Sequence, residues 1–254
     1  TAVRRLKQEG VGAIAICTLF SFIEPRHEAR IRAIVEEEYP GAFISVSHEI
    51  APEFREYERL STTVVNAYLG PIMRAYLDRL TPRLDAIGVH AEPHLTQSNG
   101  GVISCETAKS QPVRTVLSGP AAGVMAALMI GRATGHESLI TFDMGGTSSD
   151  VSLIDHGRPQ MANDIEVHGY PLKVPMLDIH TVGAGGGSIA YVDNGLLKVG
   201  PRSAGAAPGP VCYGAGSDRP TLTDANVVLG RINAERPIGG ALTRLDVEAA
   251  TEAI

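Results

Sequence analysis

The stretch TFDMGGTSSDVSLI, residues 141–154, joins two apolar segments through a short turn of small and polar residues. Gly145 and Gly146 carry no Cβ, so the chain can bend sharply there and bring backbone amides close to an anion. Hydroxyl donors occupy the next three positions, Thr147, Ser148 and Ser149. Asp143 precedes the bend and can hold Mg²⁺ or orient a water. The stretch predicts a β-hairpin whose bend faces a phosphate; an ordinary tight hairpin with a surface aspartate is the alternative.

The composition describes a globular chain that can bury a sizeable core or form two domains, since 44% of its 254 residues are hydrophobic. The net charge of −6, without a cluster of Lys and Arg, argues against nucleic acid as a partner. The three cysteines are widely spaced, which favours a reducing cytoplasm over a disulfide framework. No apolar run has the length of a membrane span, and no signal peptide is visible, so we expect no membrane partner.

Residues 1–92 show an alternation of helix-like and strand-like segments. The apolar run 12–22 is typical of a strand buried on both faces, and a helix is expected after Pro25. Residues 43–48 alternate as in a strand, and a long helix is expected from about residue 56 to about residue 86. The order predicts an α/β layer, which we interpret as the C-terminal part of a first subdomain with a long connecting helix.

Residues 93–254 predict a second α/β domain. A hairpin is expected around the turn SNGG (residues 98–101), and a helix whose N-cap is Ser118 is expected to follow. Residues 174–182 look like one strand, and residues 189–199 look like a hairpin closed by an Asp-Asn-Gly turn.

Glycine-bearing turns recur in this second part: SNGG, SGPAAG, DMGGTSS and GAGGGS. None is a P-loop, which needs GK[ST], and GAGGGS is not GxGxxG. Several such turns in one α/β domain suggest backbone amides gathered around an anionic ligand, although each can also be a simple tight turn. The candidate ligand-binding glycines are Gly100, Gly101, Gly119, Gly145, Gly146, Gly185 and Gly186.

Two further side chains are candidates for metal binding or proton transfer. Asp178 and His180 lie two apart on a predicted strand, so both are expected on the same face, just before GAGGGS. A buried Asp–His hydrogen bond that fixes the strand end is the alternative. His168 is a weaker third candidate, and Cys212 is expected to be structural because a nucleophile needs a nearby base and a lowered pKa.

Many ordered and unusual segments together resemble the hydantoinase A/5-oxoprolinase family, within the actin/Hsp70/sugar-kinase ATPase superfamily. The resembling segments are NAYLGP (66–71), SNGG, SGPAAG, FDMGGTSSDVSLI, PMLDIHTVGAGGGSIA (175–190), VGPRSAGAAPGPVCYG (199–214) and TLTDANVVLGR (221–231). They extend over nearly all the chain. FDMGGTSSDVSLI looks like the second phosphate-binding hairpin of that superfamily.

The resemblance implies a ribonuclease H-like, actin-like ATPase fold with a mixed sheet flanked by helices. It implies ATP-dependent hydrolysis of a cyclic amide such as a hydantoin or 5-oxoproline, in which ATP phosphorylates the amide oxygen and water attacks the activated carbon. Related members carboxylate ketones instead, and a non-enzymatic, nucleotide-switched binding module is a third reading. The resemblance leaves room for a hydantoinase B-like partner subunit and for a homo-oligomer.

The implied cofactors are ATP, Mg²⁺ and a second divalent metal. On the resemblance, Gly145, Gly146, Thr147 and Ser148 would hold phosphate. Asp143, Asp178 and His180 would be the catalytic and metal-binding residues.

The family carries a first phosphate loop of the DxGGTFTD kind near its N-terminus, and this chain has no such sequence. The family also continues past the position of Ile254, so we expect a central fragment of a longer enzyme. We predict that the 254-residue chain alone binds ATP weakly and turns it over poorly. Calorimetric titration with ATP measures this; micromolar affinity with robust hydrolysis would contradict the prediction.

Overall fold

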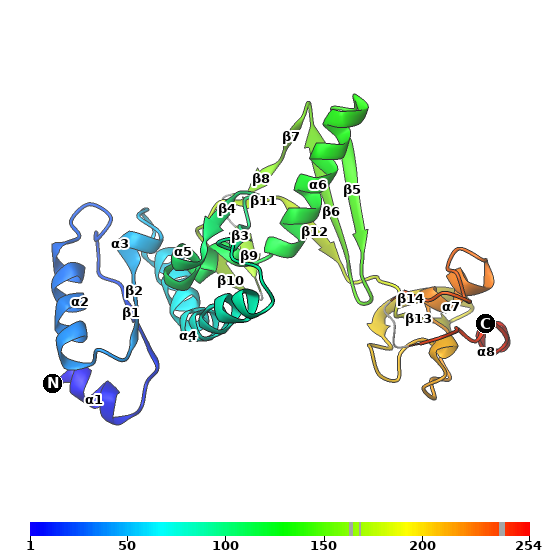
Figure 1. Ribbon diagram of the computed structural model, residues 1–254, viewed down its shortest axis with the longest axis horizontal. Coiled ribbons are helices and arrows are strands. Elements are labelled where there is room, and N and C mark those ends of the chain that lie inside the picture. Colours follow the sequence, from blue (N-terminus) through cyan, green and yellow to red (C-terminus); the bar gives the residue numbers. More distant parts are fainter. Residues whose placement is uncertain (163–164, 168, 239–241) are drawn as a thin grey trace. The chain divides into compact units, whose positions relative to one another are not determined.

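The computed structural model describes four stretches of the chain: residues 1–162, 165–167, 169–238 and 242–254. It has a mixed α/β architecture that divides into two compact units (Figure 1). Unit 1 consists of residues 1–137 and 155–178, and unit 2 of residues 138–154 and 179–254. The domain boundary predicted between residues 92 and 93 falls inside unit 1 and stays a prediction. No helix of the described residues combines the length and apolarity needed to cross a membrane.

Unit 1 begins with the alternation expected from the sequence. Its elements are α1 (Ala2–Gln8), β1 (Ala13–Ile16), α2 (Arg26–Glu38), β2 (Phe43–Val46), α3 (Ser47–Ile50) and α4 (Glu56–Ala86). Strands β1 and β2 pair in parallel, as expected when a helix connects them. The apolar run 12–22 forms a strand only as far as Ile16, so the prediction of a strand over the whole run is wrong.

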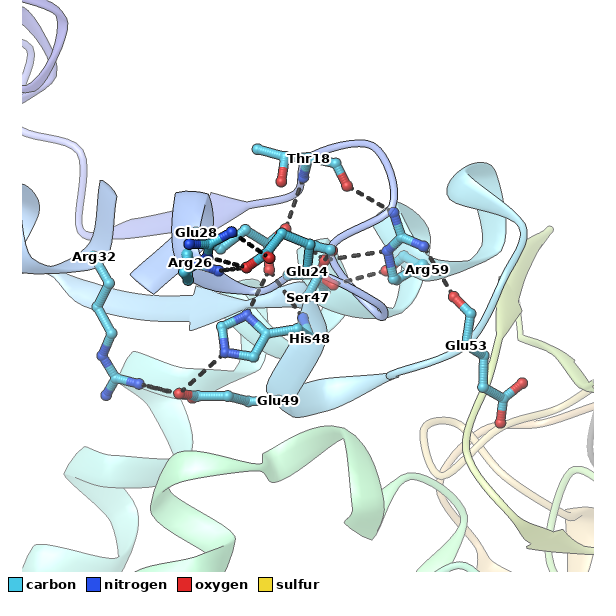
Figure 2. Close-up of polar contacts among 12 residues, drawn as sticks. Thr18, Glu24, Arg26, Glu28, Arg32, Ser47, His48, Glu49, Glu53 and Arg59 are labelled. Carbon is cyan, nitrogen blue, oxygen red and sulfur yellow. Dashed lines mark hydrogen bonds and ion pairs between the residues drawn. The ribbon is translucent and has the colours of Figure 1, made fainter. Parts of the chain in front are cut away.

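The early end of β1 has a physical cause in a buried ionic cluster, shown in Figure 2. The Thr18 amide donates to the fully buried Glu28 carboxylate at 2.7 Å, so the chain turns inward directly after the strand. The Ser47 hydroxyl donates to Glu28 at 2.7 Å, and the His48 amide donates to it at 3.0 Å. Burial alone would raise the pKa of Glu28, but these donors and the His48 ring hold the pKa below its usual value.

Arg59 on α4 completes the cluster with a buried guanidinium (Figure 2). It donates to the Thr18 carbonyl at 2.7 Å and to the Glu53 carbonyl at 2.9 Å. Its Nε also donates to the Ser47 hydroxyl at 3.2 Å. The cluster ties α2, α3 and α4 together, and its buried charged groups are hydrogen-bonded, as burial requires.

The rest of unit 1 contains two clusters of buried apolar residues, one around Val113, Leu172 and Met176 and one around Leu77, Cys105 and Ala108. Its elements are β3 (His94–Thr96), β4 (Val102–Ser104), α5 (Cys105–Ser110), the 3₁₀ helix η1 (Pro112–Thr115), α6 (Ser118–Thr134), β7 (Arg158–Pro159), β8 (Met161–Ala162), β9 (Ile165–Val167), β10 (Tyr170–Leu172) and β11 (Met176–Leu177). The predicted SNGG hairpin is β3–β4. The N-cap of α6 is Leu117 in a left-handed conformation, so the prediction of Ser118 as N-cap is wrong: Ser118 is the first helical residue.

Unit 2 contains the hairpin predicted for residues 141–154. Strands β5 (Leu139–Met144) and β6 (Ser149–Asp155) pair antiparallel, and β12 (Ile179–Val182) pairs antiparallel with the other edge of β6. The second predicted hairpin is β13 (Ser188–Asp193) with β14 (Leu196–Ser203). The unit ends with the 3₁₀ helix η2 (Val211–Tyr213), α7 (Leu222–Val228) and α8 (Val247–Ala253), which share a core around Cys212, Val227, Leu245 and Ala250.

Gly70, which belongs to the NAYLGP segment of α4, lets this helix pack closely against β2. A Cβ at Gly70 would lie 2.3 Å from the buried Phe43 ring of β2. We predict that Gly70→Ala lowers the free energy of unfolding by about 1–3 kcal/mol, because the ring or the helix must shift.

Gly119→Ala is the matched control, because a Cβ there would meet no atom within 4 Å and alanine favours a helix. Thermal unfolding followed by circular dichroism compares the two variants. Equal melting temperatures for both would contradict this account of the α4–β2 contact.

Candidate functional site

The bend of the β5–β6 hairpin is held by a second glycine-rich segment, residues 183–188. The Gly186 amide donates to the Gly145 carbonyl at 2.9 Å, and the Gly187 amide donates to the Gly146 carbonyl at 2.6 Å. The bend is closed on itself by the Gly145 amide, which donates to the Ser148 carbonyl at 2.8 Å. Two of the glycine turns that the sequence singled out therefore lie against each other within unit 2.

The approach of the two segments is so close that side chains are excluded. A Cβ at Gly185 would lie 2.7 Å from backbone atoms of both Thr147 and Ser148. A Cβ at Gly187 would lie 2.9 Å from the Gly146 carbonyl oxygen. Because the obstructing atoms belong to the backbone of the bend, they cannot rotate away, and glycine is the residue that fits.

The direction of the bend amides follows from this contact. In a trans peptide the carbonyl and the amide hydrogen point in opposite directions. The Gly145 and Gly146 carbonyls point to residues 186 and 187, so the amides of the same peptides, those of Gly146 and Thr147, point away from that segment. Both residues are exposed, and neither amide donates a hydrogen bond within the described part of the chain. Consecutive outward amides of this kind form an anion-binding concavity.

Two further segments donate hydrogen bonds to the carbonyls of Gly186 and Gly187. Thr223 donates to the Gly186 carbonyl through both its amide and its hydroxyl, each at 2.8 Å. The Ala204 amide donates to the Gly187 carbonyl at 2.8 Å. We call this assembly the glycine junction and define it as residues 145–148, 183–188 and 203–205 with Thr223.

One face of the β12–β6–β5 sheet carries paired acidic residues beside the bend. The register places Asp143 directly opposite Asp150, and Thr181 opposite Asp150 on the other side. The Thr181 hydroxyl donates to the Asp150 carboxylate at 2.7 Å and fixes its orientation. Like charges directly opposite each other across strands are unfavourable unless something offsets them, and a cation does so.

Asp150 and Thr181 are candidate site residues that the sequence reasoning missed. The sequence contained the information for Asp150, because Asp143 and Asp150 lie at equal distances from the bend and must face each other once a hairpin forms.

His180 and Asp178 do not join this acidic face. His180 is opposite Val151, which is opposite Phe142, so its side chain belongs to the other face of the sheet from Asp143. Asp178 lies between β11 and β12, in unit 1, and the prediction that it shares one strand face with His180 is wrong. Among the described residues, no group of three or more His, Cys, Asp and Glu side chains has the arrangement to hold a metal by itself.

The other predicted glycines belong to unit 1. The Gly100 amide donates to the Gln97 carbonyl at 3.0 Å, and the Gly101 amide donates to the Asn99 side chain at 2.9 Å, so both are used inside their own turn. Gly119 lies in the first turn of α6. Their predicted role in ligand binding stays a prediction, and His168 lies outside the described residues.

Cys212 has the environment of a structural residue. Burial, and after it the nearby Asp224 carboxylate, raises the pKa of the thiol to about 12, so it stays protonated at neutral pH. The fully buried Asp224 accepts from the amides of Cys212 and Thr221, each at 2.8 Å, and forms a capping box with Thr221 at the start of α7. Burial opposes its ionisation, but these donors hold the pKa of Asp224 below its usual value.

Comparison with known proteins identifies the class to which this fold and junction belong. A sequence profile described as Hydantoinase/oxoprolinase matches residues 59–254, and one described as Hydantoinase/oxoprolinase N-terminal region matches residues 1–39. The chain belongs to the hydantoinase/oxoprolinase family.

Two relatives and one solved structure are similar to this chain over nearly all of its length. The chain is 43% identical to the caprolactamase subunit alpha of Pseudomonas jessenii over 254 residues, which is all of this chain and 36% of the relative. It is 38% identical to the acetophenone carboxylase gamma subunit of Aromatoleum aromaticum, over 95% of this chain and 34% of the relative. The crystal structure of the ATP-dependent caprolactamase from P. jessenii matches with a TM-score of 0.84 at 43% identity, over 100% of this chain and 37% of that chain. The chain thus spans about a third of the length of these relatives.

The close contact in the glycine junction leaves no room for a side chain at residue 185. We predict that Gly185→Ala displaces the bend, because the added methyl group collides with the Thr147–Ser148 backbone. The measurement is the backbone amide NMR spectrum: resonances of residues 145–148 should shift while those of unit 1 keep their positions. Gly183→Ala, in the same glycine segment, is the control for the effect of an added methyl group, because a Cβ there meets no atom within 4 Å and the backbone is not left-handed. An unchanged bend in Gly185→Ala would contradict the contact.

Proposed function

We propose that this chain supplies the phosphate-binding part of an ATP-dependent enzyme that hydrolyses a cyclic amide of the hydantoin, 5-oxoproline or lactam type. The observation that carries the proposal is the glycine junction, in which outward amides of the bend lie beside the Asp143–Asp150 pair. Family membership and the resemblance to an ATP-dependent caprolactamase support it. The actin-like ATPase fold belongs to the same proposal.

The residues of the junction fit a nucleotide phosphate with its metal ion. The Gly146 and Thr147 amides, with the Thr147 and Ser148 hydroxyls, provide donors for phosphate oxygens. Asp143 and Asp150 provide carboxylates, and Mg²⁺ is commonly bound through one or two carboxylates together with substrate phosphates. Bound Mg²⁺ would neutralise phosphate charge, and ATP would supply the phosphoryl group that activates the amide oxygen.

The chain's own contribution is positioning. Thr181 orients the Asp150 carboxylate, and the contact with residues 185–187 fixes the bend before any ligand arrives. Donors held in place in this way stabilise phosphate charge without reorganising, which is the main source of catalysis in phosphoryl transfer. His180 is left out of this ion site because it belongs to the other face of the sheet, and a second metal near Asp178 and His180 stays a prediction.

A ketone carboxylase is the second candidate, because a gamma subunit of acetophenone carboxylase is among the relatives. The subunit names of that relative and of the caprolactamase relative also support a partner subunit for this protein. ATP hydrolysis by the intact enzyme distinguishes the two: stimulation by a cyclic amide alone indicates the hydrolase. Stimulation that needs both a ketone and bicarbonate indicates the carboxylase.

The role of the carboxylate pair is tested in the intact enzyme with Asp143→Asn and Asp150→Asn. Each substitution keeps the size of the side chain and removes the charge that would bind the metal. We expect each to lower ATP-dependent turnover by about 10²-fold or more and to raise the Mg²⁺ concentration needed for half-maximal rate.

Asp193→Asn is the matched control, since Asp193 is an exposed carboxylate of β13 paired with Lys198 and lies outside the junction. It should keep the wild-type rate. Full turnover in Asp143→Asn and Asp150→Asn would refute the assignment of the pair to the metal.

A further inference from the structure

Two series of hydrogen bonds run through the peptide units of the glycine junction and end at the outward amides of the bend. In the first, which we call the Thr223 series, Thr223 donates to the Gly186 carbonyl through its amide and its hydroxyl, each at 2.8 Å. The amide of the same peptide unit, that of Gly187, donates to the Gly146 carbonyl at 2.6 Å. The Gly146 carbonyl shares its peptide unit with the outward Thr147 amide, so the series ends there.

The second series runs beside the first and begins at a different donor. The Ser188 amide donates to the Gly185 carbonyl at 3.0 Å, and the amide of the same peptide unit, that of Gly186, donates to the Gly145 carbonyl at 2.9 Å. This Ser188 series ends at the outward amide of Gly146. Each outward amide of the bend therefore lies at the end of its own series.

We propose that Thr223 is a positioning residue of the phosphate-binding bend, which acts on the Thr147 amide through two peptide units; the inference rests on the proposed phosphate site. A peptide unit that accepts a hydrogen bond at its carbonyl is polarised and donates a stronger one from its amide, by about 10–30% for each bond. Thr223 supplies two donors where Ser188 supplies one. The Thr147 amide is thus the more strongly polarised of the two outward amides and the better donor to an anion.

The start of α7 holds Thr223 in this position. The fully buried Asp224 carboxylate accepts from the amides of Cys212 and Thr221, each at 2.8 Å, and Asp224 forms a capping box with Thr221. Thr223 precedes Asp224 inside this box, so its backbone is fixed on both sides. The Gly186 carbonyl therefore meets a pair of donors that is in place before a ligand binds, as stabilisation of phosphate charge requires.

The alternative is that Thr223 only holds the glycine segment against the bend. Loss of such a clamp would loosen both contacts with the bend, and the Gly146 and Thr147 amides would change alike. Loss of polarisation would change the Thr147 amide alone, because the Ser188 series does not pass through the Gly186 carbonyl. The two readings therefore differ in an observable that belongs to single residues.

Backbone amide NMR of the labelled 254-residue chain without ligand separates these readings. Thr223→Val keeps the shape of the side chain and removes its hydroxyl donor. We expect the Thr147 amide proton resonance to move to higher field, because a less polarised N–H group is more shielded, and the Gly146 resonance to stay in place. Thr223→Ser retains a hydroxyl and should restore the wild-type resonance.

Titration of the same variants with Mg·tripolyphosphate measures the consequence for anion binding. We expect Thr223→Val to weaken binding about threefold to fivefold, a part of what one hydrogen bond contributes, and Thr223→Ser to stay within about twofold of the wild-type affinity. Thr251→Val is the matched control, since the exposed Thr251 donates its hydroxyl to the Val247 carbonyl at 2.7 Å within α8. It should change neither the bend resonances nor the affinity.

The outcomes separate this inference from the one beneath it. Equal shifts of the Gly146 and Thr147 resonances in Thr223→Val, or no shift of either, would overturn the role of Thr223, while tripolyphosphate binding by the wild-type chain would keep the phosphate site. The same weakening in Thr251→Val as in Thr223→Val would also overturn the role. If the wild-type chain binds no tripolyphosphate, the proposed phosphate site is refuted, and the role of Thr223 in it as well.

Discussion

The contact between residues 185–187 and the hairpin bend is the constraint on which the proposed site depends. Two amide-to-carbonyl hydrogen bonds and a backbone approach that excludes any Cβ hold the bend in one conformation. Because the bend carbonyls are turned toward this segment, planar trans peptides turn the Gly146 and Thr147 amides outward. The outward direction of the bend amides is thus imposed by a segment about forty residues downstream. Glycine is required there for its lack of a side chain rather than for flexibility.

The register of the three-stranded sheet β12–β6–β5 determines which polar side chains share a face. Strand alternation places Asp143, Asp150 and Thr181 together and assigns His180 to the other face. This arrangement favours a metal bound by paired carboxylates and phosphate over one bound by an Asp–His pair. Thr223 donates to the Gly186 carbonyl and so helps to hold the glycine segment against the bend.

Much of this was predictable from the sequence, and the errors have identifiable causes. The hairpin and the long helix 56–86 followed from local patterns, and family membership followed from the ordered segments. The strand predicted over residues 12–22 ended early because a buried carboxylate captures the Thr18 amide, a contact that depends on the distant residues Glu28 and Ser47. Asp178 and His180 were separated because the strand predicted over residues 174–182 is two strands with different partners. The glycine turns were expected to gather around an anionic ligand, but the direct contact between the bend and residues 183–188 depends on a register that spacing cannot give.

The central claim is that the outward amides of the bend receive phosphate. Backbone amide NMR of the isotopically labelled chain during titration with Mg·ATP tests it directly. The account predicts that the largest shifts fall on Gly146, Thr147 and Ser148, with smaller shifts at residues 185–187, whose contacts transmit any movement of the bend. Shifts confined to the turn of residues 98–101 and the start of α6, with an unaffected bend, would contradict it.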